Sequence, residues 1–236
     1  MRHNARFMRR HEHYATGTYV PSVSARVPER EYAQALDILV KGVVDILLTD
    51  VTKTRVILGL RRHEPAKGKW WLIGGRMRCG ETVEETAKRH VKRDIGVEID
   101  VTRFSFVCSS TMTWEFRVQE PVGNGTCDLG VVMTAQLTEE EIAKWSMCEL
   151  EYVEQKFWNV KDVVADETLP SPVRDGARKM LFCEREDALF KAVKANKCDT
   201  EIAELARVAF NDGKSSDEMP ICYCVNHFSR FHGMRD

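Results

Sequence analysis

The chain has 236 residues, of which 43% are hydrophobic and 30% are charged, and its formal net charge is −1. This balance is typical of an ordinary soluble protein of one or two domains, and it excludes steering toward nucleic acid or membranes by net charge. No apolar run approaches the roughly 20 residues that span a membrane. The eight cysteines are mostly scattered singly, which predicts reduced thiols and a cytoplasmic protein.

The N-terminal stretch is basic. Four arginines and three histidines fall within the first 13 positions, and a segment rich in Thr, Ser and Pro follows them. This composition predicts a flexible basic extension over residues 1–30, in which the histidines are solvated rather than bound to metal. An organelle-targeting peptide is the alternative, because such peptides are rich in arginine and poor in acidic residues.

Hydrophobic periodicity predicts the remaining elements in chain order. A short helix over 31–40 precedes strands over 43–49, 55–60 and 70–73. A helix over 81–94 is followed by β-prone segments over 97–107 and 111–118 and by a flexible connection over 120–128. The pattern ends with a strand over 130–137, a helix that begins with a capping box and ends at 145, a strand over 150–158, a helical turn over 160–164 and a helical region over 171–211. Mixed strands with interspersed helices fit an α/β/α sandwich.

The stretch 68–97 is the one around which the chain is organised. It has the pattern of a strand, a glycine turn, and a helix that a glycine ends. Gly74 and Gly75 are expected to let the backbone turn sharply, and Gly96 is expected to stop the helix. Trp70 and Trp71 belong to a core or strand edge, or form a platform for base stacking.

The spacing of polar residues in this stretch resembles the Nudix box. Six of its nine specified positions are matched, by Gly75, Glu81, Arg89, Val91, Gly96 and Val97. Asp94 replaces one glutamate of the family pattern, and His90 and Arg93 stand where the family has the two others. The resemblance implies a Nudix-type α/β/α sandwich with a mixed sheet over residues 31–168. It leaves a helical C-terminal extension over 169–213 and a disordered tail over 214–236.

The resemblance also implies a divalent cation. In the family, a carbonyl of the glycine turn and the box glutamates hold magnesium or manganese, which implies one Mg²⁺ or Mn²⁺ per chain on the Gly74 carbonyl and Asp94. His90 stands four residues before Asp94 on the same helix face, so its imidazole is a further candidate ligand, or it points into solvent. As a ligand it would favour transition metals and would lose affinity as it protonates below about pH 6.5. Arg93, on the same face, would repel a second metal and contact a phosphate oxygen instead.

Residues 59–81 resemble the GDP-mannose mannosyl hydrolase branch of this family, which attacks the anomeric carbon of the sugar. The resemblance implies that Arg61, Arg76 and Arg89 contact the diphosphate and the leaving group. The catalytic base of the branch precedes a tryptophan by four residues, and matching that tryptophan to Trp158 puts Glu154 in its place. The predicted site residues are therefore catalytic Glu154 and Arg89, substrate-binding Arg61, Arg76 and Arg93, metal-binding Gly74, His90 and Asp94, and structural Gly75, Glu81 and Gly96.

Two functions follow from these residues. The first is a metal-dependent hydrolase of a nucleoside diphosphate sugar or a related nucleotide. The second is a degenerate module that binds a nucleotide or a protein without turnover, because two box glutamates are missing. The helical extension is expected to cover the sheet, form a homodimer or cap the site. Near the C-terminus, Cys222, Cys224, His227 and His232 offer zinc ligands, but their irregular spacing favours an unstructured tail.

Overall fold

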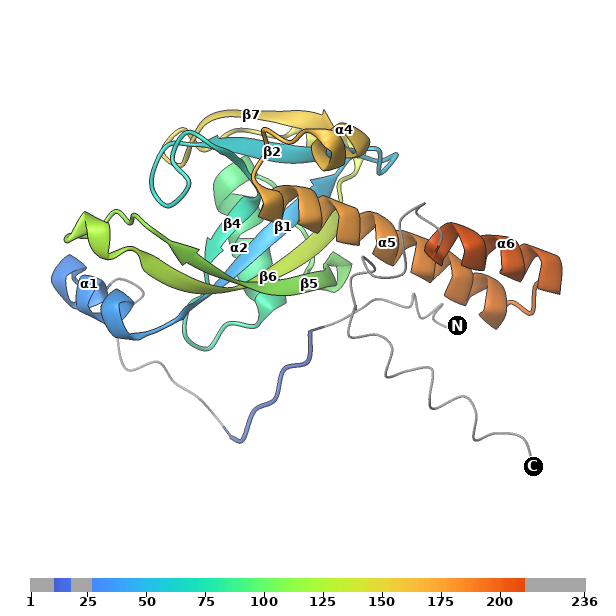
Figure 1. Ribbon diagram of the computed structural model, residues 1–236, viewed down its shortest axis with the longest axis horizontal. Coiled ribbons are helices and arrows are strands. Elements are labelled where there is room, and N and C mark those ends of the chain that lie inside the picture. Colours follow the sequence, from blue (N-terminus) through green and yellow to red (C-terminus); the bar gives the residue numbers. More distant parts are fainter. Residues whose placement is uncertain (1–10, 18–26, 211–236) are drawn as a thin grey trace. The chain divides into compact units, whose positions relative to one another are not determined.

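A computed structural model describes residues 11–17 and 27–210. The chain forms a mixed seven-stranded sheet with the strand order β3-β2-β1-β6-β5, in which β4 also pairs with β1 and β7 with β2. Figure 1 shows how the helices and strands are arranged. The elements in chain order are α1 (Glu29–Ile38), β1 (Lys41–Thr49), β2 (Arg55–Arg61), β3 (Trp70–Trp71), β4 (Ile73–Arg76), α2 (Val83–Ile95), η1 (Val101–Arg103), β5 (Ser105–Trp114), η2 (Val122–Asn124), β6 (Thr126–Gln136), α3 (Glu139–Ala143), β7 (Tyr152–Asn159), α4 (Val160–Ala165), α5 (Ser171–Lys194) and α6 (Asp199–Phe210). Here η denotes a short 3₁₀ helix.

Strand β1 is the centre of the sheet. It pairs in parallel with β6 along its whole length and antiparallel with β4 over 43–46. Its alternate residues Val44, Ile46 and Leu48 face one side, where they pack with the apolar face of α2. On the other side, Leu47 lies against Gly176 in the first turns of α5. The predicted α/β/α sandwich with a mixed sheet is confirmed, because helices cover both faces of a sheet that contains parallel and antiparallel pairs.

Most elements lie within a few residues of their predicted positions, and three differ. The Gly74-Gly75 pair lies inside β4 and not in a turn, because both glycines pair with β1. The turn comes after them. The β-prone segment predicted over 97–107 is wrong in its first part, since the chain forms η1 there and enters β5 only at Ser105. The helical region over 171–211 consists of two helices, because Asn196 adopts a left-handed backbone conformation with φ of 50° between them.

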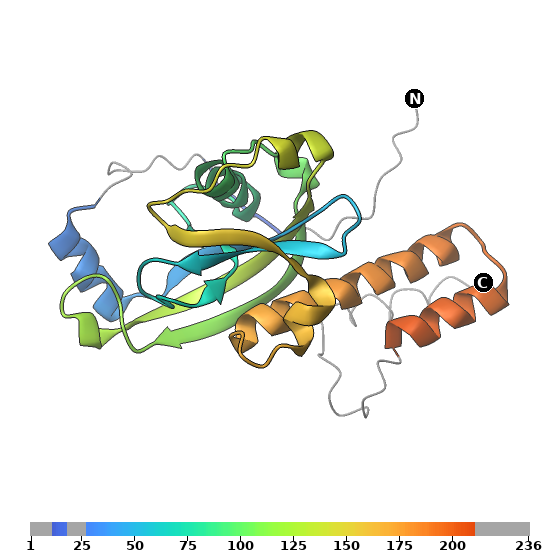
Figure 2. The ribbon, with the colours of Figure 1, turned by 90° about the horizontal axis from the view of Figure 1, so that it is seen from above.

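The chain separates into two compact units, residues 1–178 and 179–236. The first contains the sheet, and Figure 2 shows its strands from above. In the second, the rings of Phe182 and Phe210 stack edge to face with centroids 6.1 Å apart. The predicted zinc ligands and tail lie outside the described residues, as does most of the basic extension. No helix in the described ranges is long and apolar enough to cross a membrane.

Candidate active site

Helix α2 is fixed at both ends by its own sequence. The Thr82 hydroxyl accepts a hydrogen bond from the Glu85 backbone N–H, and the Glu85 carboxylate accepts one from Thr82 N–H, which completes a capping box. At the other end, Gly96 adopts φ of 72° and stops the helix as predicted. Val83, Ala87, Val91 and Ile95 are buried in the core. The opposite, polar face of α2 is therefore held in a defined orientation beside β4.

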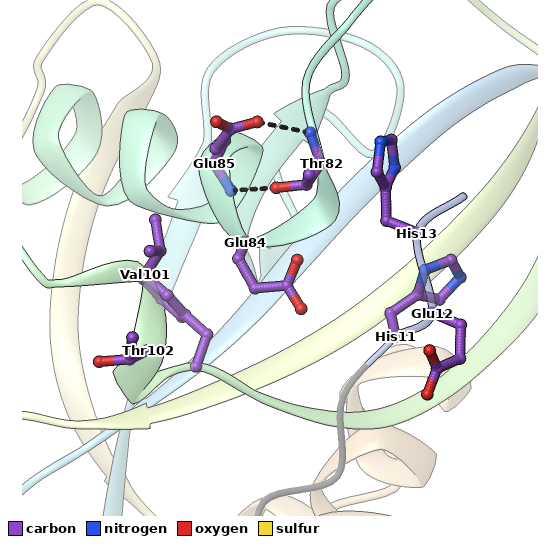
Figure 3. A pocket seen from close by; sticks show the side chains of 9 residues that line it. His11, Glu12, His13, Thr82, Glu84, Glu85, Val101 and Thr102 are labelled. Carbon is purple, nitrogen blue, oxygen red and sulfur yellow. Dashed lines mark hydrogen bonds between the residues drawn. The ribbon is translucent and has the colours of Figure 1, made fainter. Parts of the chain in front are cut away.

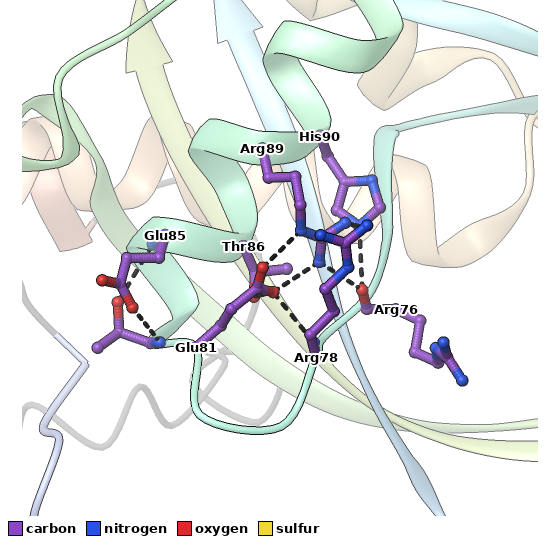
Figure 4. Close-up of polar contacts among 8 residues, drawn as sticks. Arg76, Arg78, Glu81, Glu85, Thr86, Arg89 and His90 are labelled. Atoms are coloured by element: carbon purple, nitrogen blue, oxygen red, sulfur yellow. Dashed lines mark hydrogen bonds and ion pairs between the residues drawn. The ribbon is translucent and has the colours of Figure 1, made fainter. Parts of the chain in front are cut away.

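Glu81 and Arg89 form a clamp between the loop and the helix (Figure 4). Arg89 donates from Nε and from Nη2 to the two carboxylate oxygens of Glu81, both at 2.6 Å, and Nη2 also donates to the Arg76 carbonyl at 2.9 Å. The Arg78 backbone N–H and the Thr86 hydroxyl complete the shell of Glu81. This geometry supports the structural role of Glu81. The Nε and Nη2 groups of Arg89 are used in these contacts with Glu81 and Arg76. The catalytic role of Arg89 stays a prediction.

Substitution Glu81→Gln is expected to weaken the dependence of stability on pH in acid. Burial alone would raise the pKa of Glu81, but the hydrogen bonds from Arg89, Arg78 and Thr86 lower it to about 2. Since the folded pKa is depressed, Glu81 stabilises the fold above its unfolded pKa of about 4.5, and this contribution of about 2–3 kcal/mol disappears as pH falls toward 2. Urea unfolding of both proteins at several pH values measures it. Parallel pH curves for the two proteins would contradict the expectation.

His90 is buried against β4, the strand that contains Gly74 and Gly75. Its Nε2 donates to the Arg76 carbonyl at 3.1 Å, and a Cβ on Gly75 would lie only 2.8 Å from its Cε1. Gly75 is thus required because the imidazole fills the space of a side chain. Burial, together with the nearby charge of Arg93, lowers the pKa of His90 to about 3. The predicted loss of metal affinity as His90 protonates near pH 6.5 stays a prediction, and this burial disagrees with it. The alternative in which the imidazole points into solvent is wrong, because His90 is buried.

Arg93 bridges three separate segments of the chain. Its Nη2 donates to the Gly74 carbonyl at 3.2 Å and to Asp94 Oδ2 at 3.0 Å, and its Nε donates to Asp94 Oδ1 at 2.5 Å. Its Nη1 lies 3.3 Å from Glu151 Oε1. Asp94 is fully buried and also accepts a hydrogen bond from the Tyr152 hydroxyl at 3.1 Å. Burial alone would lower the pKa of Arg93, but the hydrogen bond and charge of Asp94 raise it above its ordinary value.

A divalent metal on Gly74, His90 and Asp94 does not fit these residues as they lie. The Gly74 carbonyl and both Asp94 oxygens already accept N–H groups of Arg93. The Nε2 of His90 is directed at a carbonyl, and its Nδ1 is buried with no hydrogen-bond partner among the described residues. Within the same residues, no three His, Cys, Asp or Glu side chains are grouped to hold a metal. The predicted metal site stays a prediction, and this geometry disagrees with it.

Asp45 lies on β1 directly opposite Gly74, and its side chain alternates with those of Val44 and Ile46, which face α2. Its Oδ1 would be 3.0 Å from a Cβ placed on Gly74. Burial raises the pKa of Asp45 to about 7, although the charge of Arg61 and a hydrogen bond from Trp71 lower it in part. The charge of Arg61 also acts on the Tyr152 hydroxyl. Arg61 therefore lies close to both Asp45 and the hydroxyl that contacts the box.

An aromatic pocket of about 420 Å³ adjoins Asp45 through Trp71. Trp71 and Trp114 form one wall with ring centroids 5.2 Å apart, and Trp114 is fixed by donating from Nε1 to Asp128 at 2.8 Å. The pocket is lined by Glu64, Ala66, Lys69, Trp71, Met112, Trp114, Glu115, Phe116, Thr168, Pro170, Ser171 and Pro172. Arg61 is tied to the same loop, because its Nε donates to the Pro65 carbonyl at 2.8 Å.

Glu154 is not brought to this cluster. It pairs across the sheet with Leu60 and lies 3.5 Å from the Lys156 ammonium, on an exposed face. The next residue, Gln155, reaches α2 instead and donates from Nε2 to the Asp94 carbonyl at 3.2 Å. Because neighbouring strand residues face opposite sides, Glu154 is directed away from the box. Its role as the base stays a prediction for which this geometry gives no support.

A second pocket, of about 430 Å³, lies at the start of α2 (Figure 3). It is lined by His11, Glu12, His13, Thr82, Glu84, Glu85, Val101, Thr102 and Phe104. None of the predicted site residues lines it. The two histidines at this pocket form no metal-binding group in the described part of the chain.

Four residues of the site were missed by the sequence patterns: Asp45, Glu151, Tyr152 and Gln155. Asp45 is the single acidic residue of β1 and lies within the apolar run from Val43 to Leu48, and a charge in such a run is a signal that could have been used. Glu151, Tyr152 and Gln155 give no comparable signal. They reach the box only because β7 pairs with β2 and passes the end of α2.

Residues 40–182 match the family model described as the NUDIX domain. The chain is 35% identical over 54 residues to the oxidized purine nucleoside triphosphate hydrolase of Danio rerio, covering 23% of this chain and 35% of the relative. It is 27% identical over 78 residues to the low-salt glycan biosynthesis protein Agl8 of Haloferax volcanii, covering 33% of this chain and 49% of the relative. It thus spans less than two thirds of these curated relatives.

A solved structure is also among the similar proteins. The MutT NUDIX hydrolase from Burkholderia pseudomallei has a TM-score of 0.47 and 17% identity, with 60% of this chain and 98% of that chain covered. The family match extends over more than half of the chain and contains the whole box. The chain therefore belongs to the NUDIX domain family, as the spacing of the box indicated.

Proposed function

We propose that the chain hydrolyses a nucleoside diphosphate derivative, with nucleotide sugars as its substrate class. The observation that supports this most is the gathering of cationic groups around β4. Loss of a nucleoside diphosphate from a sugar builds negative charge on the leaving phosphate, and guanidinium groups stabilise such charge by forked hydrogen bonds. The groups concerned are Arg61, Arg76 and Arg93, with Arg89 holding the strand in place.

Arg76 is the most available of these cations. Its guanidinium carbon lies 4.5 Å from the ring centroid of Tyr32 in α1, and its carbonyl, not its side chain, is held by Arg89 and His90. A cation over an aromatic face keeps most of its N–H groups free for an anion. We therefore assign Arg76 and Arg61 to the diphosphate.

The aromatic pocket beside Trp71 suits the nucleoside or the sugar. Pockets for nucleotides are mostly apolar with a few polar groups that fix orientation, and here Glu64 and Lys69 supply such groups beside Trp71 and Trp114. The pocket shares a loop with Arg61. A nucleotide derivative can therefore occupy the pocket with its diphosphate directed toward Arg61.

Asp45 is our candidate for the group that activates water. It accepts a hydrogen bond from Trp71 of the pocket and is acted on by the charge of Arg61, whereas Glu154 lies on an exposed face beside Lys156. A carboxylate that touches the reacting water can accept its proton as the bond to the sugar or phosphate forms.

A second function is supported by Arg93. Because its guanidinium occupies the oxygens on which the family's metal would lie, the chain could instead bind a nucleotide without turnover. In the same assay, hydrolysis releases products, whereas binding without turnover releases none.

The test is a substrate panel of nucleotide sugars, dinucleoside polyphosphates and oxidised purine nucleoside triphosphates, each with EDTA, Mg²⁺ or Mn²⁺, in heavy-oxygen water. We expect a nucleotide sugar to be hydrolysed, with solvent oxygen in the released sugar. Solvent oxygen in the phosphate would show that water attacks the phosphorus atom and not the sugar carbon. Tight binding of a nucleotide with no product under any condition would contradict the proposed hydrolase activity and support binding without turnover.

A further inference from the structure

The contacts of Arg93 have the geometry of a cation site. Three oxygen-bearing groups from three segments converge on one guanidinium: the Gly74 carbonyl of β4, the Asp94 carboxylate of α2 and the Glu151 carboxylate just before β7. Carbonyl and carboxylate oxygens gathered in this way are the ligands that hard divalent cations prefer. From these contacts we infer that the Arg93 guanidinium is a built-in replacement for a divalent cation in this chain.

An ordinary helix-end interaction does not account for these contacts. A basic residue in the last turn of a helix is favoured by the helix dipole, and Arg93 is in the last turn of α2. That interaction needs only the carbonyls at the end of the same helix. Arg93 instead reaches the carbonyl of Gly74, 19 residues away in a different element. It also reaches its sequence neighbour Asp94, although consecutive residues on a helix do not face each other.

The guanidinium closes the way from solvent to Asp94. The side chain of Asp94 is 0% exposed, whereas that of Arg93 is 37% exposed. Both Asp94 oxygens accept from Arg93, and Oδ2 also accepts from Tyr152. A metal ion needs these oxygens at about 2.0–2.6 Å, so it cannot bind without displacing the guanidinium. Repulsion between the two cations in a poorly solvated site adds to this exclusion.

The charge of the site is consistent with one resident monovalent cation. Asp94 and Glu151 carry the negative charge that Arg93 neutralises in part, and Glu81 is already paired with Arg89. The Nη1 group, which faces Glu151, is not used by Gly74 or Asp94. All three nitrogens of the guanidinium thus face oxygen atoms of the protein.

If this inference is correct, removing the guanidinium creates a metal site. In Arg93→Gln the Gly74 carbonyl, Asp94 and Glu151 lose their shared donor and can surround Mn²⁺. We expect Arg93→Gln to bind Mn²⁺ at least about tenfold more tightly than the parent chain. Binding is measured on the full chain at neutral pH by the loss of the electron paramagnetic resonance signal of aqueous Mn²⁺. The measurement uses Mn²⁺ alone, so its result does not depend on the proposed hydrolase activity.

Two controls accompany this measurement. Arg93→Lys keeps a positive charge at the position, so it is expected to exclude Mn²⁺ as the parent does. Arg78→Gln removes an exposed arginine from the loop between β4 and α2. Arg78 contacts Glu81 through its backbone N–H, which the substitution keeps, so this variant should also bind Mn²⁺ as the parent does. A parent chain that binds Mn²⁺ as tightly as a folded Arg93→Gln protein overturns the inference, and so does a parent chain that binds Mn²⁺ more tightly than folded Arg93→Lys. A folded Arg93→Gln protein with no gain in affinity overturns it as well.

Discussion

Replacing Gly74 with alanine is expected to lower the free energy of unfolding by about 3 kcal/mol or more. Gly74 has φ of +152°, and a Cβ there would lie 2.1 Å from the Val44 carbonyl oxygen and 2.9 Å from the Asp45 Cα. Both atoms belong to the backbone of β1, which is paired with β4, so they cannot rotate away as a side chain would. Urea unfolding followed by circular dichroism measures the loss.

The matched control for Gly74 is Gly68→Ala. Gly68 also has a positive φ, of +71°, but no atom lies within 4 Å of a Cβ added there. This variant has the backbone strain without the collision, so it should lose only about 1 kcal/mol. The difference between the two variants measures how tightly β4 is pressed against β1. If both variants lose the same amount, the close approach at Gly74 is not what requires glycine.

The glycine pair illustrates what the sequence predicts and what it leaves open. Two consecutive glycines indicate a backbone that other residues cannot adopt, and that inference was correct. The kind of backbone was not, because glycine serves both sharp turns and close approach of two strands. The distinction depends on what lies opposite, here Val44 and the ring of His90, and neither neighbour is adjacent to the pair in the sequence.

On the polar face of α2, the sequence likewise predicted the positions of the side chains but not their contact partners. Helical geometry correctly placed His90, Arg93 and Asp94 near one another, and the capping residues fixed both ends of the helix. The roles were set by partners elsewhere. The carbonyls of Gly74 and Arg76 accept from Arg93 and His90. No spacing rule tells whether a carbonyl meets a metal ion or an N–H group.

Asp45→Asn is expected to lower kcat at least about a hundredfold on whichever panel substrate the parent chain hydrolyses, because loss of a positioned base typically has an effect of this size. Asparagine has the shape of aspartate and retains a hydrogen-bond acceptor for Trp71, so the pocket and the binding of substrate should persist. Steady-state kinetics should therefore show the loss in kcat with little change in KM. Circular dichroism and urea unfolding establish that the variant is folded.

The matched control is Glu154→Gln, which removes the carboxylate that the resemblance to mannosyl hydrolases implied as the catalytic base. Glu154 is exposed, pairs with Lys156 and is directed away from Asp94, so its replacement should change kcat by less than about threefold. Both variants replace a carboxylate by its amide, so any general effect of lost negative charge on the arginines is matched. If Glu154→Gln removes activity while Asp45→Asn retains it, the water is activated from the face of β7, and the position of Asp45 beside Gly74 has no catalytic consequence.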